Sequence, residues 1–157
     1  PYRGRLWMRE RFNGIDVYRS WLYTSTARGF AHTFVNNLTF AATALLNAIV
    51  SPRDVDVVIA SGPPYFAQFS GALAALVRDV PLVTEIRDLW PDYVEEMGMV
   101  RNRAALRAMF ASERWLLARS DAVTVVTDSF RSRIGAKGVS EQRVHVMPNG
   151  VDIDRYY

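Results

Sequence analysis

The pattern of apolar and polar residues predicts strands and helices that alternate along most of the chain. The near-continuous apolar run at 55–60 is typical of a strand buried on both faces of a parallel sheet, and the segments 82–86, 122–126 and 143–147 predict three further strands. Segments with helical spacing of large residues lie between them, at 65–77, 102–119 and 129–136, with a short helix or ordered loop at 92–99. The sequence therefore predicts an α/β fold, with a Rossmann-like parallel sheet flanked by helices.

The N-terminal third has a different pattern. Residues 14–18 alternate polar and apolar and predict a short strand or hairpin arm, followed by a loop at 19–29. Residues 30–50 predict a long helix, on which five polar residues share one stripe: His32, Asn36, Thr39, Thr43 and Asn47. Three interpretations stay open: a buried core helix, a helix that lies in a membrane interface, and a transmembrane helix, against which the polar stripe argues.

Composition and charge narrow the class of protein. The chain has 157 residues, of which 50% are hydrophobic and 22% charged, as in an ordinary globular domain. It has no cysteine and two distant histidines, so a thiolate or zinc site is not expected. It also has no GxGxxG, P-loop or metal-ligand spacing, so we expect neither a metal nor a cofactor. The net charge of +3 arises in the N-terminal arm, because residues 1–28 hold six arginines against two acidic residues and residues 29–52 hold no charge. Such an arm attracts an anionic membrane surface or is simply solvated, and no motif indicates a nucleic-acid partner.

The strand end near residue 86 is the first candidate for chemistry. Glu85, Arg87 and Asp88 are placed where the apolar run stops, and Trp90 follows. Ligands of open α/β sheets bind at such carboxyl ends. One interpretation is an internal ion pair that holds the loop; the other is a polar cluster for a hydroxylated or anionic substrate. A carboxylate beside an arginine stays ionised, so it suits hydrogen bonds to sugar hydroxyls, and Trp90 is either a stacking wall or part of the core.

Three further turns follow predicted strands. Ser61, Gly62 and Pro63 precede the helix at 65–77, and the prolines there lack the N–H groups that a phosphate would need. This turn is therefore expected either to wall a cleft or only to start the helix. Thr127 and Asn149 follow the third and fourth strands, and Asp128 or Ser129 is the expected N-cap of the next helix.

Four segments in this order, 56–64, 85–91, 120–127 and 143–152, resemble the N-terminal half of a retaining GT-B glycosyltransferase of family four. The sequence of residues 85–88, Glu-Ile-Arg-Asp, is similar to the one found in the subgroup of this family that transfers amino sugars. The resemblance implies a two-domain enzyme, with the acceptor bound by the first Rossmann-like domain and the nucleotide-sugar held mainly by the second. We then expect residues 1–150 to form the first domain without its usual first strand–helix–strand, residues 151–157 to begin the linker, and the donor domain to be absent.

The resemblance also implies a function. A sugar, expected to be an N-acetylated amino sugar, passes from a nucleotide-sugar to a lipid-linked or polysaccharide precursor acceptor, and this half alone is expected to be inactive. Asp88 would contact a sugar hydroxyl and Arg87 would offset phosphate charge as the catalytic pair. The expected substrate-binding residues are Glu85, Ser61, Gly62, Pro63, Trp90, Thr127 and Asn149.

The expected location is cytoplasmic and peripheral on the inner membrane, because the acceptor would be lipid-linked. Strands missing from the start of the sheet would leave an open edge, which predicts self-association. The alternative function is a non-catalytic Rossmann-like binding or scaffold module.

Overall fold

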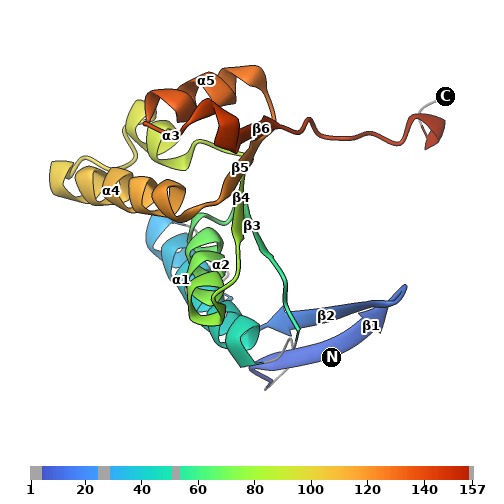
Figure 1. Cartoon of the computed structure of the whole chain (residues 1–157). Coiled ribbons are helices and arrows are strands. Elements are labelled where there is room, and N and C mark those ends of the chain that lie inside the picture. The colour runs from blue at the N-terminus through green and yellow to red at the C-terminus, as the bar shows by residue number, and fades with distance from the viewer. Residues whose placement is uncertain (1–4, 25–28, 51–53, 156–157) are drawn as a thin grey trace. The chain divides into compact units, whose positions relative to one another are not determined.

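The structure is a computed structural model that describes residues 5–24, 29–50 and 54–155 (Figure 1). Along the chain it contains the elements β1 (Trp7–Phe12), β2 (Ile15–Ser20), α1 (Phe30–Val50), β3 (Val58–Gly62), α2 (Tyr65–Arg78), β4 (Leu82–Ile86), α3 (Trp90–Glu96), α4 (Arg103–Arg119), β5 (Ala122–Val125), α5 (Asp128–Ala136), the 3₁₀ turn η1 (Glu141–Arg143), β6 (Val144–Val146) and the 3₁₀ turn η2 (Ile153–Arg155).

The central feature is a parallel sheet of four strands in the order β3-β4-β5-β6, flanked by helices. This confirms the predicted α/β class. The strands β5 and β6 pair in register from Val123 with Val144 to Val125 with Val146. The chain forms two compact units, residues 1–83 and 84–157, with the division inside β4. We call them unit 1 and unit 2 and describe each by itself.

Unit 1 begins with an antiparallel hairpin of β1 and β2 that the pattern predicted only in part. The two strands pair from Trp7 with Ser20 to Phe12 with Ile15. Asn13 and Gly14 form the turn, both with positive φ (49° and 83°), as a two-residue hairpin turn requires. The segment Trp7–Phe12 was not predicted as a strand, because it carries a charged residue at three of its six positions and does not alternate cleanly.

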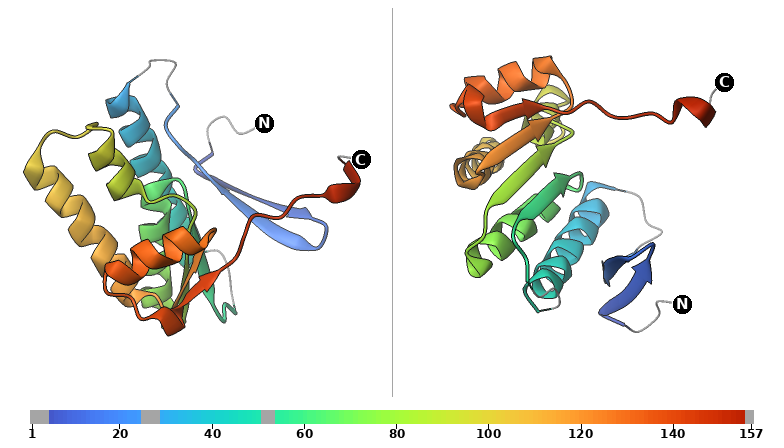
Figure 2. Two further views of the ribbon diagram at one scale, coloured as in Figure 1. Left: turned by 90° about the horizontal axis from the view of Figure 1, so that it is seen from above. Right: turned by 45° about the vertical axis from the view of Figure 1, so that its right-hand side comes forward.

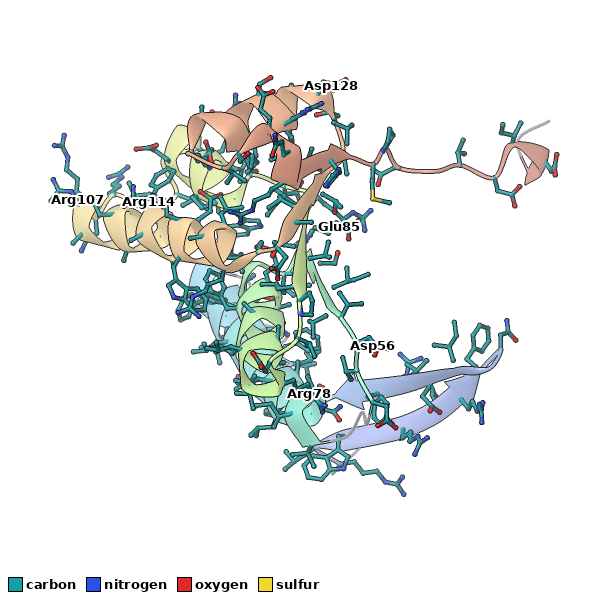
Figure 3. The ribbon with its side chains drawn as sticks, viewed as in Figure 1. Asp56, Arg78, Glu85, Arg107, Arg114 and Asp128 are labelled. Atoms are coloured by element: carbon teal, nitrogen blue, oxygen red, sulfur yellow. The ribbon has the colours of Figure 1, made fainter. Side chains whose placement is uncertain are left out.

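The helices α1 and α2 pack side by side in unit 1, as both views of Figure 2 show. The hydroxyl of Ser70 on α2 donates to the carbonyl of Ala41 on α1 over 2.7 Å. The guanidinium group of Arg78, labelled in Figure 3, donates to the carbonyls of Ala48 and Ile49 and so satisfies the C-terminal end of α1. The approach is close because the buried hydrophobic residues of α2 are mostly small: Tyr65, Ala72, Ala74 and Ala75.

Unit 2 holds the hydrophobic core of the described residues. Strand, loop and helix residues meet there in one cluster: Ile86, Leu89, Leu117, Val123, Val125, Ile134, Val139 and Val144. The predicted apolar runs at 82–86 and 122–126 supply much of this cluster because both strands are buried by the flanking helices. The candidate site lies just beyond the carboxyl ends of β4 and β5.

The starts of the helices in unit 2 are set by local chemistry. The predicted Asn102 cap of α4 is confirmed, since its side-chain oxygen accepts from the N–H groups of Ala104 and Ala105 at 2.8 and 3.2 Å. The expected cap of α5 is corrected: Thr127, not Asp128 or Ser129, is the N-cap, and it accepts from Phe130 N–H at 3.3 Å. Helix α3 begins before the predicted residue 92, because a proline is tolerated in the first helical turn.

Candidate functional site

A cavity of about 450 Å³ lies in unit 2, beyond the carboxyl ends of β4 and β5. Its walls come from the turn after β4, from α3 and from the first turns of α5. The lining residues are Asp88, Leu89, Trp90, Asp92, Tyr93, Glu96, Ser129, Phe130 and Arg133.

Helical spacing explains why these side chains share the cavity. Asp92, Tyr93 and Glu96 lie on one face of α3, because residues three and four apart project from the same side of a helix. Phe130 and Arg133 do the same on α5. Arg133 then bridges the two helices, with its guanidinium group 3.2 Å from the Glu96 carboxylate.

The cavity combines an aromatic wall with carboxylates. Trp90, Tyr93 and Phe130 supply ring faces, and Tyr93 is 52% exposed, so its ring is open to a ligand. Asp88 is exposed and forms no ion pair with any described residue, so its carboxylate oxygens can accept hydrogen bonds from outside. Apolar faces with a few placed polar groups are the usual lining of a site for a small organic ligand. The apolar face and the hydroxyl rim of a sugar ring match this lining.

An ion network lies next to the cavity. Lys137 donates to the carboxylates of Asp92 and Glu113, the latter over 2.7 Å, and its ammonium nitrogen lies 5.6 Å from the centre of the Phe110 ring. Burial raises the pKa of Glu113 above its ordinary value, and the hydrogen bond from Lys137 opposes that rise. The carboxylate of Asp92 is therefore already paired with Lys137, whereas that of Asp88 has no ion-pair partner among the described residues.

The cavity includes two of the residues that the sequence singled out after β4. Asp88 and Trp90 line it, while half-buried Glu85, labelled in Figure 3, and exposed Arg87 do not. Arg87 and Asp88 form no ion pair with a described residue, so the internal ion-pair interpretation does not hold for them. The catalytic roles of Arg87 and Asp88 stay predictions.

The other predicted site residues lie at varying distance in the fold. Thr127 does not line the cavity, but its hydroxyl lies 2.9 Å from that of Ser129, which does. Asn149 is exposed after β6 and is not part of the lining.

The turn with Ser61, Gly62 and Pro63 belongs to unit 1. It connects β3 to α2, whose N-cap position is Pro64. Gly62 is buried, and an added Cβ atom would come within 2.7 Å of the end of the Gln68 side chain, so a larger residue here would require Gln68 to shift. The turn is shaped by packing on α2, and its part in substrate binding stays a prediction.

Sequence reasoning missed most of the lining, namely Leu89, Asp92, Tyr93, Glu96, Ser129, Phe130 and Arg133. The helical spacing within α3 and within α5 was a usable signal that the lining residues of each helix share one face. No signal in the sequence showed that these two helix faces line the same cavity. Within the described part of the chain, no group of three His, Asp or Glu side chains is arranged to hold a metal ion.

A parallel sheet flanked by helices, with a cavity beyond the carboxyl ends of two strands, defines a Rossmann-like α/β domain. Residues 1–150 match the glycosyl transferase 4-like domain, and the chain belongs to that family. The fold is consistent with a Rossmann-like half of a GT-B glycosyltransferase. No curated protein sequence matches the chain.

Proposed function

We propose that this chain is the acceptor-binding half of a retaining GT-B glycosyltransferase, and that the cavity between α3 and α5 holds a sugar ring of the acceptor. The donor would be a nucleotide-sugar carrying an N-acetylated amino sugar, and the acceptor a lipid-linked or polysaccharide precursor. The observation that carries the proposal is the pairing of Asp88 with an aromatic wall at the end of β4, in a chain of the glycosyl transferase 4-like family.

The charge of the cavity favours a neutral, hydroxylated group over a phosphate. The lining holds three carboxylates and one cation, Arg133, so it carries two excess negative charges; Lys137, which lies outside the lining, is shared between Asp92 and Glu113. A phosphate beside Asp88 would meet a like charge, whereas a sugar hydroxyl would donate a hydrogen bond to it. Arg87 lies outside the lining, where it could attract the diphosphate of a donor or of a lipid-linked acceptor.

A binding experiment tests the acceptor site. The probes are N-acetylglucosamine and glucose, followed by saturation-transfer NMR on the 157-residue chain. We expect ring protons of the N-acetylated probe to receive saturation, and Asp88→Asn to weaken binding at least tenfold, because hydrogen bonds to a charged group contribute about 1.5–3 kcal/mol. Trp90→Ala should remove the ring-face contact.

The matched control is Glu95→Gln, because Glu95 is an exposed carboxylate on α3 that does not line the cavity. It should leave binding unchanged. Equal loss in Glu95→Gln and Asp88→Asn would contradict the assignment of the cavity, and so would the absence of saturation transfer from the unmodified chain.

A turnover assay tests the division of labour between two domains. If donor contacts lie in a second domain, the 157-residue chain should bind sugar without releasing nucleoside diphosphate from a nucleotide-sugar. Sustained release by this chain would overturn that division while leaving the acceptor site in place. Sugar binding by the chain, with no transfer even when a donor domain is supplied, would favour a binding module instead.

A further inference from the structure

Unit 1 buries small residues and exposes large ones. Among its described residues, Tyr65 and Leu82 are the large hydrophobic residues that are buried, and the rest of its buried hydrophobic set is alanine: Ala41, Ala60, Ala72, Ala74 and Ala75. Several large apolar side chains of the hairpin and of α1 are instead more than one-third exposed, among them Trp7, Phe12 and Leu46. An exposed apolar surface of this extent indicates a site of interaction.

The polar stripe of α1 is occupied by the chain itself. Asn36 donates to the carbonyl of Tyr23 over 2.6 Å, and Thr39 accepts from the N–H of Tyr23 at 3.0 Å. Thr43 donates to the carbonyl of Trp21 over 2.5 Å, and Asn47 donates to the hydroxyl of Ser20 over 3.1 Å. The stripe thus holds the segment that leaves β2.

A second side of α1 packs on α2, through Ala41 with Ser70 and through the edge-to-face rings of Phe34 and Phe66, whose centres are 5.3 Å apart. Residues His32–Val50 are long and apolar enough to cross a membrane by length and composition. Because α1 is held by protein on two sides, however, it is suited to lie on a bilayer rather than to cross one.

The third side of α1 is apolar and exposed. Val35 lies four residues before Thr39, and Leu46 and Val50 lie three and seven residues after Thr43, so they flank the polar stripe. Their exposed fractions are 43%, 58% and 75%. The helix is therefore not the buried core helix that one interpretation of the sequence favoured.

This exposed side continues into the aromatic residues that the stripe holds. Trp21 and Tyr23 are 41% and 38% exposed, although their backbones are bonded to α1. The N–H of Trp21 donates to the carbonyl of Leu6 over 2.8 Å, which brings the hairpin base, with exposed Leu6 and Trp7, to the same place. We call this set the aromatic surface of unit 1: Leu6, Trp7, Trp21, Tyr23, Val35, Leu46 and Val50.

The hairpin whose base belongs to the aromatic surface is positively charged. The described residues 5–24 hold four arginines against Glu10 and Asp16. Arg9 pairs with Asp16 and Arg19 with Glu10, while Arg5 and Arg11 form no ion pair with a described residue. Residues 29–50 carry no charge at all.

We propose that the aromatic surface of unit 1 docks on an anionic lipid bilayer, with the hairpin arginines on the headgroups and α1 lying along the interface. Tryptophan and tyrosine have an apolar ring and a polar tip, so they favour the boundary between headgroups and acyl chains. Neighbouring arginines bind the anionic headgroups. A second copy of the chain is a poorer occupant, because a twofold contact would bring the surplus arginines of one hairpin near those of the other.

The test is co-sedimentation of the 157-residue chain with vesicles of phosphatidylcholine, with and without phosphatidylglycerol. Neither vesicle contains an acceptor, so the result does not depend on the proposed function. We expect binding to the anionic vesicles that falls steeply between about 0.1 M and 1 M salt, as the Debye length shrinks. Arg5→Gln with Arg11→Gln should weaken it about thirtyfold, and Leu46→Gln about tenfold.

Matched controls lie elsewhere on the chain. Leu76→Gln changes a leucine of α2 with a similar exposed fraction, 54%, and Arg131→Gln changes an exposed arginine of unit 2. Both should bind vesicles as the unchanged chain does, with the same circular dichroism spectrum.

The proposal is overturned if the chain ignores anionic vesicles, or if Leu76→Gln weakens binding as much as Leu46→Gln. It is equally overturned if sedimentation in the absence of lipid shows a dimer that Leu46→Gln dissociates, since the surface would then bind a second copy.

Discussion

The ammonium group of Lys137 lies 2.7 Å from the carboxylate of Glu113, a residue that is only 3% exposed. The same ammonium group donates to Asp92, which lines the candidate site. One cation thus joins α3, α4 and the end of α5. It is the single lysine of the chain, against 18 arginines.

Replacement of Lys137 by methionine should destabilise unit 2 strongly. The substitution leaves the Glu113 carboxylate buried without its cation, and breaking a buried pair in this way costs about 3–5 kcal/mol. The free energy of unfolding, from urea titration followed by circular dichroism, measures the effect. The double variant Lys137→Met with Glu113→Leu should regain much of the loss, because no charge is then buried.

The control for that prediction is Arg133→Met. This substitution breaks the ion pair between Arg133 and Glu96, whose two side chains are 52% and 63% exposed. The loss of unfolding free energy should therefore stay below about 1 kcal/mol. Equal losses in Lys137→Met and Arg133→Met would show that the Lys137 network contributes no more than a surface pair.

The raised pKa of Glu113 predicts a pH dependence of stability. A carboxyl whose pKa is higher in the folded chain than in the unfolded chain keeps its proton to higher pH when folded. Protonation therefore favours the folded state at low pH, and this advantage is lost as the pH rises from about the ordinary value of 4.5 through the raised pKa. Glu113→Gln should remove this fall in unfolding free energy, and Lys137→Met should steepen it. An identical pH profile in Glu113→Gln and the unchanged chain would contradict the assignment.

A buried pair of hydroxyls makes the third prediction. Thr84 on β4 and Ser120 after α4 lie 2.7 Å apart, and Ser120 also donates to the carbonyl of Leu116 over 2.9 Å. Since Ser120 has one hydroxyl proton, Thr84 is the donor to it. Ser120→Ala should cost about 1–3 kcal/mol, because it leaves the Thr84 hydroxyl buried without that acceptor. In a Thr84→Val background the same change should cost clearly less, and equal costs in thermal unfolding would refute the pairing.

The strands and most helices could be predicted because the local pattern of apolar and polar residues in each reflects which of its faces are buried. The buried run at 82–86 matches β4, and the long uncharged segment matches α1 at both ends. Only the second strand of the hairpin was predicted, because β1 carries Arg9, Glu10 and Arg11 in a row. Residues 7–12 form a strand because they pair with β2, and their hydropathy does not indicate it. Element type followed local pattern, whereas pairing required a partner that the pattern does not show.

The candidate site was found in part for the same reason. Asp88 and Trp90 stand out because polar and aromatic residues follow a buried strand. Tyr93 and Phe130 lie 37 residues apart in the sequence and share a cavity only because tertiary packing brings α3 and α5 together. The stripe on α1 was recognised, but its role in holding Trp21 and Tyr23 depends on where the hairpin returns. Contacts of this kind arise from tertiary packing, which periodicity alone does not specify.

Two glycines in helices predict opposite effects of the same substitution. In Gly71→Ala the added Cβ would lie 2.5 Å from the Cβ of Ala60, and neither atom can swing away, so α2 must move from β3. We expect a loss of about 1–3 kcal/mol, as for an overpacked core. In Gly135→Ala the new Cβ meets nothing within 4 Å, so helix propensity should add about 0.5–1 kcal/mol to the stability. Urea unfolding of both variants measures the difference, and a stabilised Gly71→Ala would mean that α2 and β3 are not packed as closely as the structure shows.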